Sequence, residues 1–226
     1  LNIQFIHDGS AEARARAQSA IDVALLRAKA DDAIVNSWRA DSELARLNAD
    51  GQITASPDLL AAVNSARDYW TMTGGLFDPS VGPLIKAWKK AQEEQRLLID
   101  AQVEELRNVI GFSGVTIDGA KITLPKGGAL DLGGMNKGWI IDRCAEIIAR
   151  SLGEYDAATL GYGGSSMRTL GHNSVDNIPI RHPADPKRIV QIIEFRAGNG
   201  MGISSGIGQT FTVNGMVYSH LINPLT

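Results

Sequence analysis

The fold is decided by the stretch Ala129–Gly138, which reads ALDLGGMNKG. Its first part, Ala129–Leu132, is typical of a short strand, Gly133 and Gly134 of a turn, and Asn136 of a helix start. The first amides of a helix have no partner within the helix and favour an anion such as phosphate. On its glycines alone, however, the stretch is more typical of an ordinary strand-to-helix turn.

The helix expected after this turn covers Asn136–Ser151 and carries an apolar stripe at helical spacing. The stripe consists of Ile140, Ile141, Cys144, Ile147 and Ile148. Cys144 is the only cysteine, which excludes an internal disulfide and a thiolate zinc site, and it is interpreted as a small buried residue. Lys137 lies in the first helical turn, where the dipole disfavours a cation unless an anion neutralises it.

Working outward, the sequence predicts further helices and hairpins. The capping residues Ser10 and Ser56 precede two of the helices. The helices are expected over Ala11–Ala30, around Ser42–Leu47, from Ser56 to Gly74-Gly75, and over Asp100–Val109. The strands are expected at Val115–Ile117 and Lys121–Leu124, at Phe211–Val213 and Met216–Tyr218, and at Ile189–Phe195. Hairpins mixed with helices indicate an α+β fold instead of alternating βαβ units.

Composition narrows the function classes. The chain has 226 residues and a formal net charge of −3, which gives no general attraction to nucleic acid. No apolar run approaches the roughly 20 residues that a membrane span needs. The sequence begins at Leu1, which is compatible with a mature form from which a signal peptide or lipid anchor was removed.

Several polar residues have two open interpretations. Asp131 follows a buried-looking strand, and a buried carboxylate needs a partner, either N–H groups or a metal. Asp78, before a proline, is suited to capping a turn or to accepting hydrogen bonds from a ligand. Asp142 is interpreted as structural, and His220, beside a strand, is also more typical of a structural residue than of a catalyst.

Six segments, in order and with matching spacing from about Ala11 onward, resemble the bacterial FAD:protein FMN transferases, formerly called thiamine-biosynthesis lipoproteins. The segments are Trp38–Asn48, Gly75–Trp88, Ala129–Asp142, Gly161–Gly171, Ile203–Gly206 and Tyr218–Thr226.

The resemblance implies a single T-fold-like flavin transferase domain over residues 1–226, with antiparallel sheets and packed helices. It implies that FAD is bound and that its FMN part is transferred to a Thr or Ser hydroxyl of a partner flavoprotein, releasing AMP. It further implies that Mg²⁺ assists at the pyrophosphate. A periplasmic or cell-envelope location is expected on the same ground.

The resemblance also assigns roles residue by residue. The catalytic residues expected from it are His220 and Lys137. The metal ligands expected are the Asn136 carbonyl, Asn223 and Thr226. The residues expected to bind the cofactor are Trp38, which matches an aromatic near the isoalloxazine ring, and Ser42, Glu43, Asp78, Gly82, Leu84, Asp131, Gly133, Gly134, Lys137, Asp142, Ser204, Ser205 and Gly206.

Two positions depart from the family pattern. Asn223 stands where the family has a metal-binding Asp, and Ser165 stands where the family's Gly-Gly-Asp has its Asp. An amide oxygen can still bind Mg²⁺ but brings no charge, so weaker metal binding is expected. The alternatives are a carrier or sensor that keeps FAD or FMN without transferring it, and an enzyme that hydrolyses the FAD pyrophosphate.

Overall fold

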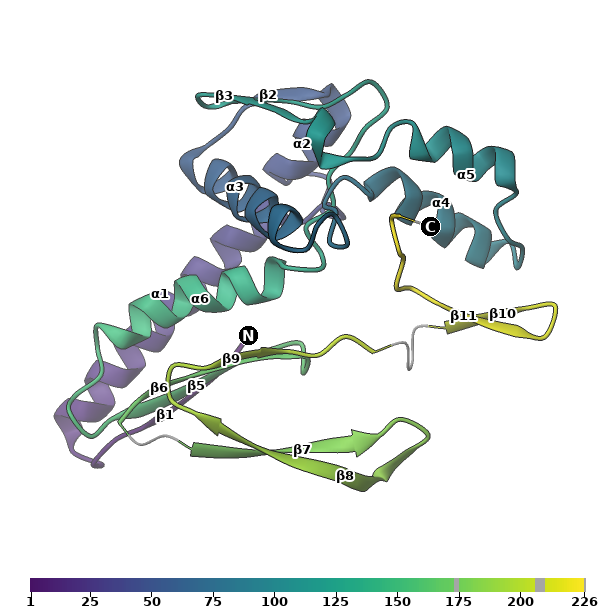
Figure 1. Cartoon of the computed structure of the whole chain (residues 1–226). Helices are drawn as coiled ribbons and strands as arrows, with labels where there is room; N and C mark the ends of the chain where they lie inside the picture. Colours follow the sequence, from purple (N-terminus) through teal and green to yellow (C-terminus); the bar gives the residue numbers. More distant parts are fainter. Residues whose placement is uncertain (173–174, 206–209, 226) are drawn as a thin grey trace. The chain divides into compact units, whose positions relative to one another are not determined.

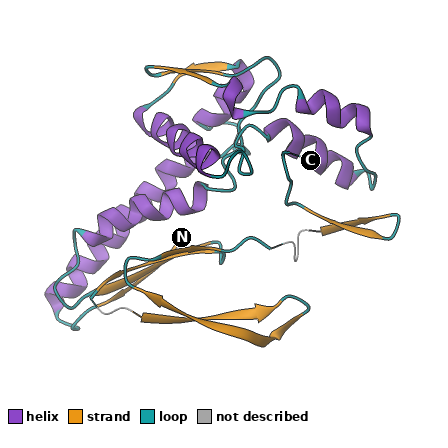
Figure 2. Cartoon of the chain, viewed as in Figure 1, coloured by secondary structure: helices purple, strands orange, loops and turns teal. Residues whose placement is uncertain are grey.

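The computed structural model describes residues 1–172, 175–205 and 210–225, in which helices and antiparallel strands are mixed (Figures 1 and 2). The expected α+β fold class is confirmed. The chain divides into two compact units, each of which is described by itself. The first unit consists of Leu1–Ala30 and Lys137–Ser204, and the second of Asp31–Asn136 and Ser205–Thr226.

The first unit is built on a four-stranded antiparallel sheet in the order β1-β5-β6-β9. Its strands are β1 (Asn2–Ile6), β5 (Ala157–Tyr162), β6 (Ser166–Gly171) and β9 (Gly200–Gly202). A separate hairpin joins β7 (Val175–His182) to β8 (Asp185–Arg196). The long helices α1 (Ala11–Val35) and α6 (Asn136–Ala149) lie side by side over the sheet (Figure 1).

Small residues allow α1 and α6 to pack closely. Within the first unit, the buried residues of α1 are all alanines, at positions 13, 17, 20, 24 and 28. Opposite it, α6 buries Ile140, Ile141, Cys144 and Ile148 as its sequence pattern predicts, whereas the fifth residue of the predicted stripe, Ile147, is only half-buried. The Cys144 thiol donates to the Ala24 carbonyl oxygen at 3.3 Å, so a side chain of α6 reaches the backbone of α1. The prediction that Cys144 is a buried, structural residue is confirmed.

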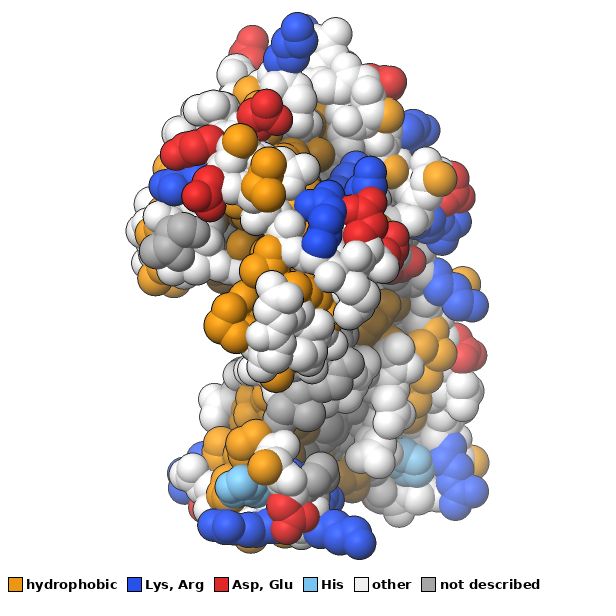
Figure 3. Space-filling model, turned by 90° about the vertical axis from the view of Figure 1, so that its right-hand side faces the viewer, with side chains coloured by type: hydrophobic (Ala, Val, Ile, Leu, Met, Phe, Trp, Pro, Cys, Tyr) orange, Lys and Arg blue, Asp and Glu red, His pale blue; other side chains and the backbone are white. Residues whose placement is uncertain are grey.

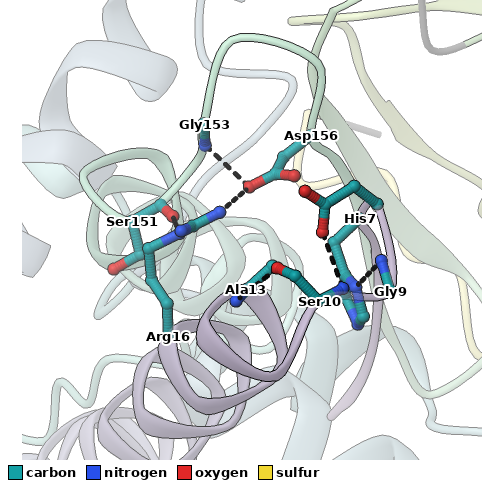
Figure 4. A network of polar contacts seen from close by, with 9 residues as sticks. His7, Gly9, Ser10, Ala13, Arg16, Ser151, Gly153 and Asp156 are labelled. Atoms are coloured by element: carbon teal, nitrogen blue, oxygen red, sulfur yellow. Dashed lines mark hydrogen bonds and ion pairs between the residues drawn. The ribbon is translucent and has the colours of Figure 1, made fainter.

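A polar network fixes the start of α1 in the first unit (Figure 4). The Ser10 hydroxyl caps the helix by accepting a hydrogen bond from the Ala13 amide at 3.1 Å, as predicted. Two turns on, the Arg16 guanidinium donates to the Ser151 carbonyl at 2.9 Å and to Asp156 at 2.7 Å. The Gly153 amide donates to the same Asp156 oxygen at 2.7 Å. The network thus ties α1 to the connection between α6 and β5.

The second unit combines helices with two small antiparallel sheets, ordered β2-β4-β3 and β10-β11. Its helices are α2 (Glu43–Asp50), α3 (Pro57–Met72), α4 (Gly82–Glu93), α5 (Asp100–Arg107) and the short 3₁₀ turn η1 (Phe112–Gly114). Its strands are β2 (Gln52–Thr54), β3 (Thr116–Asp118), β4 (Lys121–Thr123), β10 (Thr210–Val213) and β11 (Met216–Ser219). The predicted Ser56 cap of α3 and both predicted hairpins in this unit are confirmed.

The structure corrects two local expectations. Residues 129–132 do not form a strand, because only Ala129 makes a bridge, with Val81. Helix α4 is not among the helices expected from the sequence, because the two prolines and the glycine of residues 77–84 are typical of a loop. Pro83 instead occupies the first turn of α4, where a missing N–H costs nothing.

The surface carries mixed charge. Figure 3 shows positive and negative side chains near one another in the upper part of the face and along its edges, in keeping with the small net charge. Within the described ranges, no helix combines the length and the apolar character that crossing a membrane requires.

Candidate functional site

In the second unit, two loops from distant parts of the sequence run side by side. The Asp131 amide donates to the Pro79 carbonyl at 2.7 Å, and Val81 bridges to Ala129 in parallel. A Cβ added to Gly82 would lie 2.7 Å from the Ala129 carbonyl oxygen, so this approach requires glycine. Two motifs that the sequence placed apart, at 77–84 and 129–142, therefore meet.

The side chain of Asn48 holds the loop of residues 129–132 in place. Its amide nitrogen donates to the Leu130 carbonyl at 2.8 Å, and its amide oxygen accepts from the Leu130 amide at 2.7 Å. One side chain thus satisfies both polar groups of a buried residue that has no strand partner.

Asp78 caps the first loop. One carboxylate oxygen accepts from the amide of Ser80 at 2.8 Å and from its hydroxyl at 2.5 Å, and the other accepts from the Phe112 amide at 3.3 Å. The Ser80 hydroxyl in turn accepts from the Gly111 amide at 2.6 Å. Of the two interpretations left open for Asp78, the structure shows the turn-capping contacts, while contact with a cofactor stays a prediction.

Asp131 joins two functional segments. Its Oδ2 accepts from the Ser37 hydroxyl at 2.8 Å, and its Oδ1 accepts from the Gly133 amide at 2.7 Å. Ser37 precedes Trp38, and Gly133 opens the glycine turn. The buried carboxylate therefore has the protein partners that burial requires, and it ties the turn that carries Trp38 to the glycine turn.

The glycine turn leads directly into α6. The amides of Met135 and Asn136 both donate to the Leu132 carbonyl, at 2.9 and 2.8 Å, which closes the turn. A Cβ on Gly134 would lie 3.0 Å from the Phe77 ring, so the turn passes against this ring with no side chain between them. The amides that follow in the first turn of the helix are those that favour an anion.

Trp38 presents its ring at the surface of the same unit. The side chain is 54% exposed, and the Lys89 ammonium lies 3.3 Å from the centroid of its ring. An indole that is more than half exposed offers a planar, apolar surface on which a ligand ring can stack.

Three further residues assigned to the cofactor have structural contacts. The Ser42 hydroxyl caps α2 by accepting from the Ala45 amide at 2.9 Å. Glu43 accepts from the Ser56 amide at 2.7 Å and from the Ser56 hydroxyl at 2.6 Å, which links the starts of α2 and α3. Leu84 is buried in the first turns of α4.

The closing segment of the second unit turns back toward α3. The Leu225 side chain reaches the neighbourhood of Gly75, where a Cβ would lie 3.8 Å from it. Asn223 Oδ1 accepts from the Leu225 amide at 2.9 Å, and His220 is exposed just after β11. Thr226, like Gly206, lies outside the described residues.

The expected metal ligands that the structure describes, the Asn136 carbonyl and Asn223, bring no charged oxygen to a magnesium site. Across residues 1–172, 175–205 and 210–225, no group of three His, Cys, Asp or Glu side chains could hold a metal ion. Asn223 offers a neutral amide oxygen that already accepts one hydrogen bond, whereas Mg²⁺ prefers at least one carboxylate.

The first unit holds the remaining site residues. The Lys137 ammonium donates to the Ser165 hydroxyl at 2.7 Å, and Lys137 packs over Gly163. Asp142 pairs with Arg168, as its structural interpretation predicts. Ser204 is exposed just beyond β9; Ser205, the first residue of the second unit in this part of the chain, is also exposed.

A pocket of about 590 Å³ opens in the first unit between the sheet and the β7–β8 hairpin. Its lining includes Ser165, Ser166 and Gln4 from the sheet side and Ile178, Ile180 and Arg181 from β7. Ser165 is thus shared between this pocket and the Lys137 contact.

Sequence reasoning missed four residues that shape the site: Ser37, Asn48, Ser80 and Lys89. Asn48 carries a signal, because an Asn inside a helix is unfavourable unless its side chain has a partner. Ser37 and Ser80 lie in polar turns, where many serines bond locally, and Lys89 lies 51 residues from its partner Trp38 (89 − 38). Nothing in the local sequence pairs them.

Comparison with known proteins gives one family throughout. A family model described as the ApbE family matches residues 2–226. The FAD:protein FMN transferase of Vibrio cholerae serotype O1 is 28% identical over 200 residues, which cover 85% of this chain and 59% of the relative. That of Escherichia coli K12 is 23% identical over 227 residues, covering 96% and 63%. The chain therefore spans about three fifths of the length of these curated relatives.

Solved structures agree on the fold. The ApbE protein of Thermotoga maritima superimposes with a TM-score of 0.83 at 20% identity, covering 98% of this chain and 72% of that one. A mutant form of the flavin transferase ApbE from Vibrio cholerae superimposes with a TM-score of 0.74 at 26% identity, covering 100% and 73%.

Proposed function

The chain belongs to the ApbE family, and from this premise we propose that it is an FAD:protein FMN transferase. It binds FAD, transfers the FMN part to a Thr or Ser hydroxyl of an acceptor flavoprotein and releases AMP. The relatives that carry this name support the proposal.

One observation carries the proposal in the structure. Asp131 joins the turn that carries the exposed Trp38 to the glycine turn that opens α6. A flavin dinucleotide needs a surface for its planar ring and a set of amides for its pyrophosphate. The Asp131 contacts tie the turn that carries Trp38 to the glycine turn Gly133-Gly134, both in the second unit, which suits the two turns to the two ends of one ligand.

The chemistry asks for positioning and charge stabilisation more than for covalent help. The acceptor hydroxyl oxygen attacks the phosphorus of the FMN half, the bond from this phosphorus to the bridging oxygen breaks, and AMP leaves with that oxygen. The proton of the hydroxyl passes to a base, for which we propose the exposed His220. From the resemblance we propose that the Lys137 ammonium, which lies in the first unit, stabilises the developing charge.

Magnesium assistance, as implied by the resemblance, is proposed only in a weakened form. The described residues offer Asn223 where a carboxylate is expected, so no step is assigned to the metal. A hard cation that does bind would neutralise charge on the pyrophosphate.

The test is transfer itself. The chain is incubated with FAD, a range of Mg²⁺ concentrations and an acceptor flavoprotein that carries a Thr or Ser target. Covalent flavin on the acceptor and AMP in equal amounts are expected. No covalent flavin at any Mg²⁺ concentration would overturn the proposal, and AMP with free FMN would assign the chain to pyrophosphate hydrolysis instead.

A second candidate function is a carrier or sensor that retains FAD or FMN without transferring it. Asn223 and Ser165, which stand where carboxylates are expected, favour this candidate, and the Ser165 hydroxyl is engaged by Lys137. Flavin that copurifies with the chain, together with the absence of transfer, would identify it.

A further inference from the structure

Among the described residues of the second unit, the ammonium of Lys89 is the cation that lies against the ring of Trp38. If Trp38 stacks on the flavin, as the proposed function implies, this contact affects how FAD binds. The Lys89 ammonium lies 3.3 Å from the ring centroid, within the range of a cation–π contact. Such contacts at exposed sites contribute little binding energy. The consequence of this contact is therefore the orientation that it gives the Trp38 ring.

The backbone that carries Trp38 is fixed on both sides of the residue. The Trp38 amide donates to Asn36 Oδ1 at 3.0 Å, and the hydroxyl of Ser37 donates to Asp131 at 2.8 Å. The ring is nevertheless 54% exposed, so the fixed backbone leaves the side chain free to rotate unless something contacts the ring.

The base of Lys89 is fixed as well. Its neighbour Trp88 donates from its indole nitrogen to the Ser219 carbonyl at 3.1 Å. The Trp88 ring packs edge-on against Phe211 and Tyr218, with centroids 5.4 and 6.0 Å apart. Helix α4 is thereby anchored where Lys89 leaves it, and the ammonium is delivered to one face of Trp38.

We propose that Lys89 is a positioning residue for the flavin: its ammonium holds the Trp38 ring in one orientation, so that the opposite face is ready for the isoalloxazine. This inference rests on the proposed function. Lys89 does not touch the reacting phosphorus; it lowers the ordering cost of stacking because the indole is already oriented before FAD arrives.

The role proposed for Lys89 concerns only the flavin end of FAD, so it can be tested separately from binding of the phosphates. Isoalloxazine is planar and stacks on an indole, whereas ADP has the same pyrophosphate and adenosine without the flavin ring. A residue that orients Trp38 affects FAD binding and leaves ADP binding unchanged, while a residue that attracts phosphate by charge affects both ligands.

The experiment measures binding of FAD and of ADP to the purified chain and to three variants. FAD binding is followed by quenching of flavin fluorescence, and ADP binding by calorimetry. Lys89→Met removes the charge and keeps the length of the side chain, Lys89→Arg keeps a cation that stacks on aromatic rings, and Lys90→Met is the matched control. Lys90 is the next residue on α4, exposed, with its ammonium 3.9 Å from Glu94.

Lys89→Met is expected to weaken FAD binding by about threefold to tenfold and to leave ADP binding within about twofold of the wild type. Lys89→Arg and Lys90→Met are expected to bind FAD as the wild type does. In a Trp38→Ala background, Lys89→Met is expected to have no further effect, because the ring that it orients is gone.

Three results would overturn the role of Lys89: unchanged FAD binding, tighter FAD binding, or equal losses for FAD and ADP. The second would make Lys89 a competitor for the ring, and the third would assign it to the phosphates. A wild-type chain that binds neither ligand would contradict the proposed function, so the two failures are distinguishable.

Discussion

Single side chains in this molecule connect segments that are far apart in the sequence, and Asp156 is a clear case. The Gly153 amide, and then the Arg16 guanidinium, hold the pKa of the Asp156 carboxyl below its ordinary value. Because folding stabilises the charged form, the Asp156 carboxylate contributes fully to the free energy of unfolding above the unfolded-state pKa of about 4. It is lost as the pH falls through the lower pKa of the folded state.

We therefore expect Asp156→Asn to lower the free energy of unfolding by about 1 to 2 kcal/mol at neutral pH. The difference from the wild type should shrink as the pH falls below about 4, where the wild-type carboxyl becomes protonated. Urea denaturation at several pH values measures it, with the exposed Asp50→Asn as the matched control. A difference that persisted unchanged at low pH would contradict the role of the charge.

Asn223 stands at a position where a charged side chain is expected to strengthen Mg²⁺ binding. Its amide oxygen caps the turn at Leu225, and an aspartate has the same shape and can accept the same hydrogen bond. Asn223→Asp should therefore leave the fold intact and lower the Mg²⁺ concentration for half-maximal transfer by about tenfold, since a hard cation gains a charged ligand.

The matched control for this change is Asn214→Asp, an identical change of charge in the exposed turn between β10 and β11. Adding Ser165→Asp should increase transfer further if the missing carboxylates limit it. Equal effects of Asn223→Asp and Asn214→Asp would show that general charge, and not a metal ligand, is responsible.

Among the secondary-structure elements, the packing of α1 against α6 depends on small side chains on α1, which let the Cys144 thiol of α6 reach the α1 backbone. Ala24 is fully buried, and its carbonyl touches Cys144. Ala24→Leu should lower the free energy of unfolding by about 1 to 3 kcal/mol, because the added atoms have no space. Val23→Leu, on the exposed side of α1, should have little effect. Denaturant titration compares the two, and equal stabilities would contradict this account of the packing.

Elements with a local signal could be predicted from the sequence. The caps Ser10 and Ser56 and the turns at Asp118-Gly119 and Asn214-Gly215 act through neighbours a few residues away, and each was found where its pattern indicates. Helix α4 was missed because Pro83 is compatible with both a loop and a first helical turn.

Elements that depend on distant partners could not be predicted in the same way. Strand β1 pairs with β5 across more than 140 residues of sequence, and residues 129–132 are held by Asn48 and Pro79 and not by a neighbouring strand. In the site, the resemblance selected Asp78, Asp131 and Glu43, but only the structure shows which protein groups their carboxylates accept from.

At the scale of the whole molecule, the family assignment and the α+β fold agree, while a single domain over residues 1–226 stays a prediction beside the two compact units. The expected periplasmic or cell-envelope location likewise stays a proposal. The central claim is that one dinucleotide stacks its flavin on Trp38 and rests its pyrophosphate on the glycine turn Gly133-Gly134 of the same unit.

The most direct test is a crystal structure of the chain soaked with FAD. The account predicts phosphate density against the glycine turn Gly133-Gly134, with the isoalloxazine on the face of Trp38 opposite Lys89. Phosphates bound elsewhere, with this turn unoccupied and the Trp38 ring uncovered, would contradict it.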